Sequence, residues 1–189
     1  MRLTGNEDLR VIKTIEAIKS AFEALICEKN YEKITVKELC ERAKINKKTF
    51  YHYYETLDAL LAEMQTERVE GYLERVGQYL LPDEIDKVNR EFFLYATEQG
   101  LAFEKITCGG SYRLIRDEMT DVVTTTAWSR SEAFQKLDPY EQKVLINFVN
   151  DTVLRLYREW VHDGKPVPVA EVIDIANKLV TGGVNGLFR

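Results

Sequence analysis

Apolar residues recur along most of this chain every three or four positions, which is the period of an amphipathic α-helix. Near the start, one face of such a helix carries Leu9, Ile12, Ile15, Phe22, Leu25 and Ile26. A second clear stripe carries Leu145, Phe148, Val149, Thr152, Leu156 and Trp160. No stretch shows the strict alternation of a half-buried β-strand. The pattern therefore predicts an all-α fold.

Helix start and stop signals divide the second part of the chain. Thr56 can cap a long helix that runs to about Leu81. The run Asp138-Pro139-Tyr140-Glu141 combines a cap, a first-turn proline and a glutamate, and predicts a helix that ends near His162. A last helix is expected over residues 169–187. Between these, several helices are expected with breaks at Gln99-Gly100 and Gly109-Gly110.

The stretch ITVKELCERAKINKKTFYHYY, residues 34–54, begins with a capping box. The Thr35 hydroxyl can accept a hydrogen bond from the Glu38 backbone N–H, while the Glu38 carboxylate reaches back to Thr35. A short helix is therefore expected from Val36 to Ala43.

A second short helix follows after a tight turn. Asn46 is a good N-cap for a helix from Lys47 to about Tyr54. Two short helices joined in this way form a helix-turn-helix unit, whose second helix places its first turn against base edges in the major groove of DNA. That first turn would carry Lys47, Lys48 and Thr49. Tyr51 and Tyr53 are long enough to bring their hydroxyls to phosphates.

Charge supports this interpretation. The 189-residue chain has a formal net charge of −5, yet residues 29–54 hold seven Lys or Arg against three Asp or Glu. Residues 57–189 hold 15 basic against 22 acidic side chains. Positive charge gathered on one part of an acidic protein is what a DNA-binding face needs, because phosphate contacts supply much of the affinity.

The same stretch resembles the DNA-binding region of the TetR family of one-component regulators. The matching positions are Thr35, Val36, Glu38, Leu39, Ala43, Ile45, Thr49, Phe50 and Tyr51, followed by Ala59-Leu60-Leu61. The resemblance implies an all-α, TetR-like protein of about nine helices, with a three-helix head bearing the helix-turn-helix. It places the DNA-binding domain at residues 1–55 and a helical regulatory and dimerisation domain at residues 56–189.

Three positions depart from the family pattern. Lys44 stands where the turn usually has glycine, and a left-handed lysine there costs on the order of 1 kcal/mol. Tyr53 occupies the common histidine position, with His52 one residue earlier. Leu57 replaces a lysine that often contacts phosphate.

The resemblance also implies how the protein binds DNA. A homodimer would dock two recognition helices in successive major grooves of a palindromic operator. Thr35, Tyr51 and Tyr53 would hold phosphates, and Lys47, Lys48 and Thr49 would read base edges. His52 would contact the DNA backbone or solvent.

The family resemblance further implies a dimer formed through residues of about 139–188 and a small-molecule effector bound in the body. Candidates for the effector pocket are Tyr95, Phe103, Tyr112, Arg113, Trp128, Phe148 and Tyr157. Aromatic residues at helical spacing are more often plain core, and a surface ion pair is the more common role for an arginine such as Arg113. The sequence does not identify the effector.

Other classes of function have little support. The two histidines are far apart, and no Cys/His cluster has metal-ligand spacing. No phosphate-binding glycine loop occurs, so neither catalysis, a metal nor another cofactor is expected. The three cysteines and the lack of a long apolar run favour a cytoplasmic protein without a membrane span. One alternative remains, in which a TetR-like fold acts as a coactivator through a protein partner.

Overall fold

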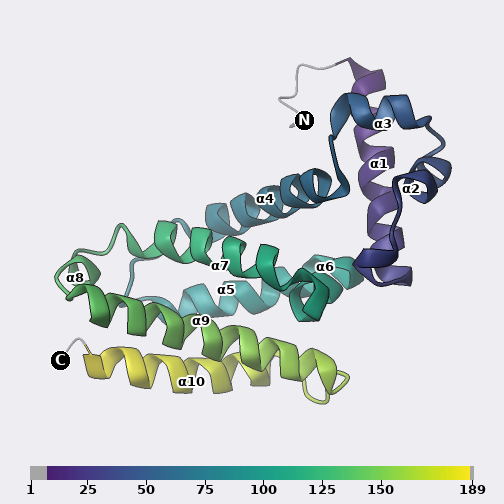
Figure 1. The fold of residues 1–189 in the computed structure, drawn as a ribbon. Helices are drawn as coiled ribbons and strands as arrows, with labels where there is room; N and C mark the ends of the chain where they lie inside the picture. The colour runs from purple at the N-terminus through teal and green to yellow at the C-terminus, as the bar shows by residue number, and fades with distance from the viewer. Residues whose placement is uncertain (1–7, 188–189) are drawn as a thin grey trace. The chain divides into compact units, whose positions relative to one another are not determined.

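The structure, a computed structural model, describes residues 8–187 and is entirely helical over that range (Figure 1). The all-α prediction is confirmed. There are ten α-helices in the described residues rather than about nine. The helices are α1 (Leu9–Glu28), α2 (Val36–Ala43), α3 (Lys47–Tyr53), α4 (Leu57–Val76), α5 (Ile85–Glu98), α6 (Gly100–Cys108), α7 (Arg113–Trp128), α8 (Glu132–Gln135), α9 (Pro139–His162) and α10 (Val169–Leu187), with two short 3₁₀ helices, η1 (Tyr31–Lys33) and η2 (Gly110–Tyr112).

The chain forms two compact units. The head unit comprises the described residues up to Arg68 together with Leu101–Ile115, and the body unit comprises Val69–Gly100 and the described residues from Arg116 onward. Helix α4 therefore contributes residues to both. The sequence pattern did not reveal that α6 and η2 belong with the N-terminal helices.

The head unit has one apolar core. Helix α1 packs against α2, and α2 packs against α3. Phe22, Leu39 and Phe50 are fully buried, one from each of these three helices. Residues from α4 and α6 complete this core, including Leu60 and Ile106. This packing holds α3 in place, because a helix of seven residues has little stability of its own.

In the body unit, α10 packs along both α9 and α5. Figure 1 shows α10 antiparallel to each of them. The buried stripe of α10 is small and β-branched: Val172, Ile173, Ala176, Val180 and Val184. Aromatic rings fill the region around Tyr157, whose ring centroid lies 5.6 Å from that of Phe92 and 6.1 Å from that of Phe93.

Most predicted helix ends are confirmed. Asp138 forms the capping box of α9 with Glu141, and the Thr56 hydroxyl accepts from the Ala59 backbone N–H at 3.0 Å. The expectation that α4 extends to about Leu81 is wrong, because α4 ends at Val76. Gly77 follows, and its carbonyl accepts a hydrogen bond from Arg130 at 2.8 Å, which satisfies a helix-terminal group without a further turn. None of the described helices is long and apolar enough to cross a membrane.

Candidate DNA-binding surface

The first helix of the motif, α2, begins as its sequence predicts. The Thr35 hydroxyl accepts from the Glu38 backbone N–H at 3.3 Å and lies 3.1 Å from a Glu38 carboxylate oxygen, to which it donates. Lys29 binds the other Glu38 oxygen at 2.7 Å, and this hydrogen bond, with that from Thr35, lowers the pKa of Glu38. Glu38 therefore stays ionised and ties the start of α2 to the end of α1.

The turn between the helices depends on Lys44, which has a left-handed backbone with φ 56° and ψ 41°. Its backbone N–H caps α2 by donating to Glu41 O. Asn46 then caps α3, since its side-chain oxygen accepts from the Thr49 backbone N–H at 2.8 Å and from the Thr49 hydroxyl at 3.1 Å. The turn thus presents a third lysine next to the start of α3.

Lys47 and Lys48 lie exposed in the first turn of α3. Neither they nor Lys44 forms an ion pair with any other residue in the described range. Other basic side chains of the head unit do pair with carboxylates: Lys19 with Glu63 and Glu67, Lys29 with Glu38, Lys37 with Glu41, Arg42 with Glu28, and Arg68 with Glu23. The positive charge at the turn and the start of α3 is therefore not neutralised within the head and is free to meet phosphates.

The inner side of α3 is anchored to the core. Phe50 is fully buried, and Tyr54, at the C-cap, is 3% exposed. The Tyr54 hydroxyl donates to a Glu63 carboxylate oxygen of α4 at 2.8 Å, and Lys19 of α1 lies 3.4 Å from the same oxygen. This contact fixes the end of α3 against two longer helices. The sequence alone does not indicate this role for Tyr54, because the motif pattern identifies the aromatic residue but not its partner.

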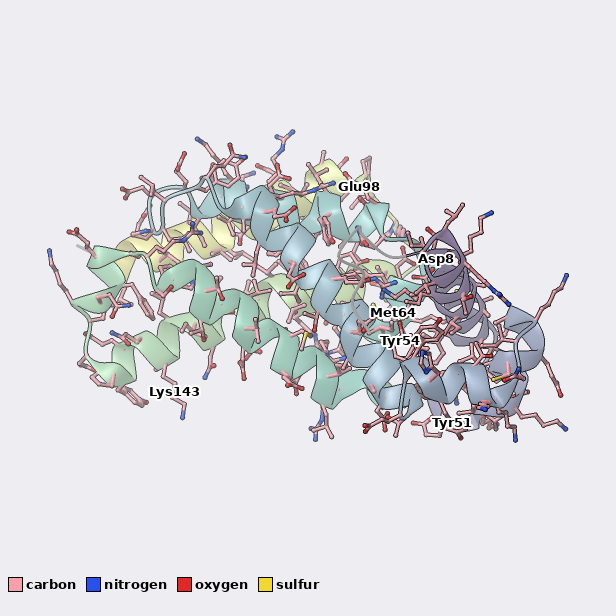
Figure 2. All side chains as sticks on the ribbon, turned by 90° about the horizontal axis from the view of Figure 1, so that it is seen from above. Asp8, Tyr51, Tyr54, Met64, Glu98 and Lys143 are labelled. Atoms are coloured by element: carbon pink, nitrogen blue, oxygen red, sulfur yellow. The ribbon has the colours of Figure 1, made fainter. Side chains whose placement is uncertain are left out.

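The outer side of α3 carries the remaining candidates. Tyr51 is 55% exposed, and Figure 2 shows its side chain at the edge of the head whereas Tyr54 lies inward. His52 is exposed, and its ring stacks edge-on against Tyr53 at 4.9 Å. Tyr53 packs partly against the core and keeps part of its surface in solvent. Thr35, Lys47, Lys48, Tyr51 and His52 are thus exposed, while Thr49 and Tyr53 are half-buried.

A sequence model of the bacterial regulatory proteins of the tetR family matches residues 18–64, which run from the middle of α1 to the first turns of α4. These are the residues that build the surface just described. Residues 18–64 therefore carry the DNA-binding region of the bacterial regulatory proteins of the tetR family. Among curated protein sequences, none matches this chain.

Solved structures of TetR-family regulators share the fold. The fatty acid degradation regulator FadR from Bacillus halodurans is 16% identical, with a TM-score of 0.66 over 90% of this chain and 96% of that one. FadR from Bacillus subtilis, in complex with stearoyl-CoA, is 15% identical, with a TM-score of 0.64 over 90% and 98%. NalD, the secondary repressor of the MexAB-OprM multidrug efflux pump in Pseudomonas aeruginosa, is 17% identical, with a TM-score of 0.62 over 92% and 98%.

The residues predicted to line an effector pocket are divided between the two units. Tyr112 belongs to the head unit, where its ring lies 5.4 Å from Tyr31, and Phe103 stacks with Arg68 of the same unit. In the body, Trp128 packs on Phe134. Arg113 is exposed, Phe148 is exposed beside Gly183, Tyr95 lies under Arg75, and Tyr157 is buried among aromatic rings.

Proposed function

We propose that this protein is a cytoplasmic TetR-family repressor that binds a palindromic operator as a homodimer and leaves it when a small molecule binds the body. In this proposal residues 1–55 bind DNA and residues 56–189 dimerise and bind the effector, without catalysis or a cofactor. Lys47, Lys48 and Thr49 read base edges, while Thr35, Tyr51, Tyr53 and His52 contact the backbone.

The observation that carries the proposal is the unpaired positive charge in the first turn of α3. Lysine side chains that form no ion pair within the head pay no internal cost when they move onto a phosphate or a guanine edge. The capped ends and buried inner side of α3 hold them in a fixed position before DNA arrives. Preorganisation of this kind lowers the entropy cost of binding.

Support for the homodimer comes from α9 and α10. Their outward sides carry large exposed apolar residues, among them Val144, Phe148, Ile175 and Leu179. Burying such apolar surface against a second copy contributes about 25 cal/mol per Å² and therefore favours association. The C-terminal part of the proposed interface, residue 188, lies outside the described residues.

Support for release by a ligand comes from the neighbours. One of them is a complex with stearoyl-CoA and another is named as a repressor. For release, the effector must bind the DNA-incompetent form of the body more tightly than the competent form.

The test is a fluorescence-anisotropy titration of the purified protein against tiled duplexes from the DNA flanking its own gene, at two salt concentrations. The proposal predicts tight binding to one tile and a log–log salt slope of about 0.9 per phosphate neutralised. A folded dimer that binds no tile, or whose binding does not depend on salt, would contradict the proposal for these tiles and favour a protein-partner role.

A further inference from the structure

The body unit buries a row of polar atoms that have no hydrogen-bond partner among the described residues. Asn89 Nδ2 on α5 and Asn177 Oδ1 and Thr181 Oγ1 on α10 all lie in this group. Asn89 is 3% exposed and sits between Ile85 and Phe93 in the buried stripe of α5. A buried polar atom without a partner destabilises a fold, so such atoms in a native protein call for a partner from outside the chain.

Other polar groups in the same unit satisfy one another. Asn150 Nδ2 of α9 donates to the Thr124 hydroxyl of α7 at 2.8 Å, and Asn150 Oδ1 lies 3.0 Å from the same hydroxyl oxygen. Thr120 and Thr124 also donate to the carbonyls four residues earlier, the usual bond of a helical threonine. Thr181 makes no such bond within the described residues. The body therefore contains a closed Thr–Asn pair, in which the two side chains hydrogen-bond to each other, and an open set of polar atoms that have no partner among the described residues.

The positions of Asn89, Asn177 and Thr181 along their helices bring the three unpartnered atoms to one seam, the contact between α5 and α10. Tyr157 of α9 contacts Phe92 and Phe93 of α5. Phe148 lies against Gly183 of α10, so in this antiparallel pair Tyr157 is level with about residue 174 of α10. Asn89 lies one turn before Phe93 on α5, and Asn177 lies one turn after residue 174 on α10. Because the two helices are antiparallel, both steps lead in the same direction in space.

Thr181 follows one turn beyond Asn177, on the same side of the helix. Both lie about a third of a turn or more around α10 from Gly183, which faces α9. Both residues are half-buried and lie beside the buried residues Ile173, Val180 and Val184 of α10. The open atoms therefore belong to the side of α10 that faces α5 rather than α9.

We infer that Asn89, Asn177 and Thr181 form the polar end of the effector site, and that they take an uncharged group offering both an acceptor and donors, such as a carboxamide. Asn89 Nδ2 donates to the carbonyl of that group, while Asn177 Oδ1 and Thr181 Oγ1 accept from its N–H. The identification of the bound molecule as the effector rests on the proposed function, whereas binding at this site does not require DNA.

The surroundings favour a neutral group on an apolar molecule. Ile85, Phe93, Val180 and Val184 line the same helix faces. The charged residues nearest along α10, Asp174 and Lys178, are exposed and pair with each other at 2.6 Å. An anionic head group would lose its hydration here, and the nearest cation along α10, Lys178, is already paired with Asp174, so burying such a group is costly in an apolar interior.

The test uses the full-length protein and octanamide as the probe, with octanoate as the charged compound of matched length. Side-chain amide signals of Asn89 and Asn177 are followed in ¹H–¹⁵N NMR spectra during each titration. We expect saturable shifts of both signals with octanamide and none with octanoate. Asn89→Leu should weaken octanamide binding at least tenfold and raise Tm by about 2–4 °C, since it replaces an unpartnered polar group with an apolar one.

Thr181→Val keeps the shape of the side chain and should weaken octanamide binding without lowering Tm. The matched control is Thr124→Val, which breaks the closed pair: its Tm should fall while octanamide binds as in the wild type. Absence of shifts up to the solubility limit, or equal affinity of Asn89→Leu and wild type, would overturn the inference and leave buried water as the partner.

DNA binding is measured in parallel with and without octanamide, which separates the two proposals. Octanamide binding by a protein that binds no DNA would uphold the polar site and contradict the proposed function. Specific DNA binding by a protein that ignores octanamide would do the reverse.

Discussion

The recognition motif, residues 34–54, and the seam between α5 and α10 differ in whether their polar side chains have hydrogen-bond partners. In the motif, Thr35 and Asn46 cap helices and Tyr54 binds Glu63. In the seam, Asn89, Asn177 and Thr181 each bury an atom that has no partner among the described residues. Both regions are helical and both are packed on apolar cores.

The difference separates two tasks. A surface that reads DNA benefits when its own polar groups are already bonded, because the side chains that contact DNA then start in position. A site that senses a small molecule benefits when its polar groups are left for the ligand, because the ligand then makes contacts that the empty site lacks. Variants in the two regions should therefore change stability in opposite directions.

The largest effect on stability is expected from Tyr54→Phe. It removes a hydrogen bond between a buried hydroxyl and a carboxylate, and should cost about 2 kcal/mol in the free energy of unfolding. Urea denaturation measures this cost. Tyr51→Phe is the matched control, because the Tyr51 side chain is exposed, and it should change stability by less than about 0.5 kcal/mol. Equal costs for the two variants would contradict the anchoring role of Tyr54.

A smaller effect is expected from Asn46→Ala, which removes the cap of α3. The loss should be about 1 kcal/mol, and Asn46→Ser, which keeps a capping oxygen, should lose much less. DNA affinity should fall with the alanine variant because the first turn of α3 carries Lys47 and Lys48. An unchanged unfolding midpoint would show that Asn46 does not hold the motif in place.

The smallest effect on stability at neutral pH is expected from Tyr112→Phe. Tyr112 belongs to the head but, unlike the polar groups of the recognition motif, it resembles the residues of the seam. The Tyr112 hydroxyl is buried without a partner among the described residues, so its removal should leave stability unchanged or raise it by up to about 1 kcal/mol. Burial raises the pKa of Tyr112 to about 12, above the ordinary value of 10.0.

The pH dependence of this variant follows from the direction of that shift. The folded state favours the neutral phenol, so the contribution of Tyr112 is fully present below pH 10 and is lost as pH rises through about 12. Thermal unfolding between pH 9 and pH 12 should therefore show a smaller alkaline loss for Tyr112→Phe than for the wild type. Parallel curves for the two proteins would exclude Tyr112 as a source of that loss.

Local chemistry predicted much of the fold. The side-chain caps at Thr35 and Asn46 define the starts of α2 and α3, and the capping box of Asp138 with Glu141 defines the start of α9. These signals act within one helical turn, so they can be recognised in the sequence alone. The predicted end of α4 was wrong because the stop at Val76 involves Arg130, 53 positions away from Gly77.

Contacts between distant segments account for what the sequence did not predict. The exposure of Lys47 and Lys48 follows from their place in α3. Their lack of an ion pair among the described residues depends on which cations the nearby acidic side chains bind instead, as Glu38 binds Lys29. The partner of Tyr54 and the open atoms at Asn89 and Asn177 likewise depend on which helices pack together. A single sequence contains no local sign of such pairings.

The most direct test of the central claim compares two double variants on the duplex that the wild type binds best. Lys47→Ala/Lys48→Ala removes the unpaired charge at the start of α3, and Lys87→Ala/Lys136→Ala removes two exposed lysines of the body that lie outside the proposed dimer interface. Fluorescence anisotropy should show specific binding falling at least about 100-fold for the first, with a salt slope smaller by up to about 2, and unchanged for the second. Specific binding retained by a folded Lys47→Ala/Lys48→Ala variant would contradict the assignment of α3 as the recognition helix.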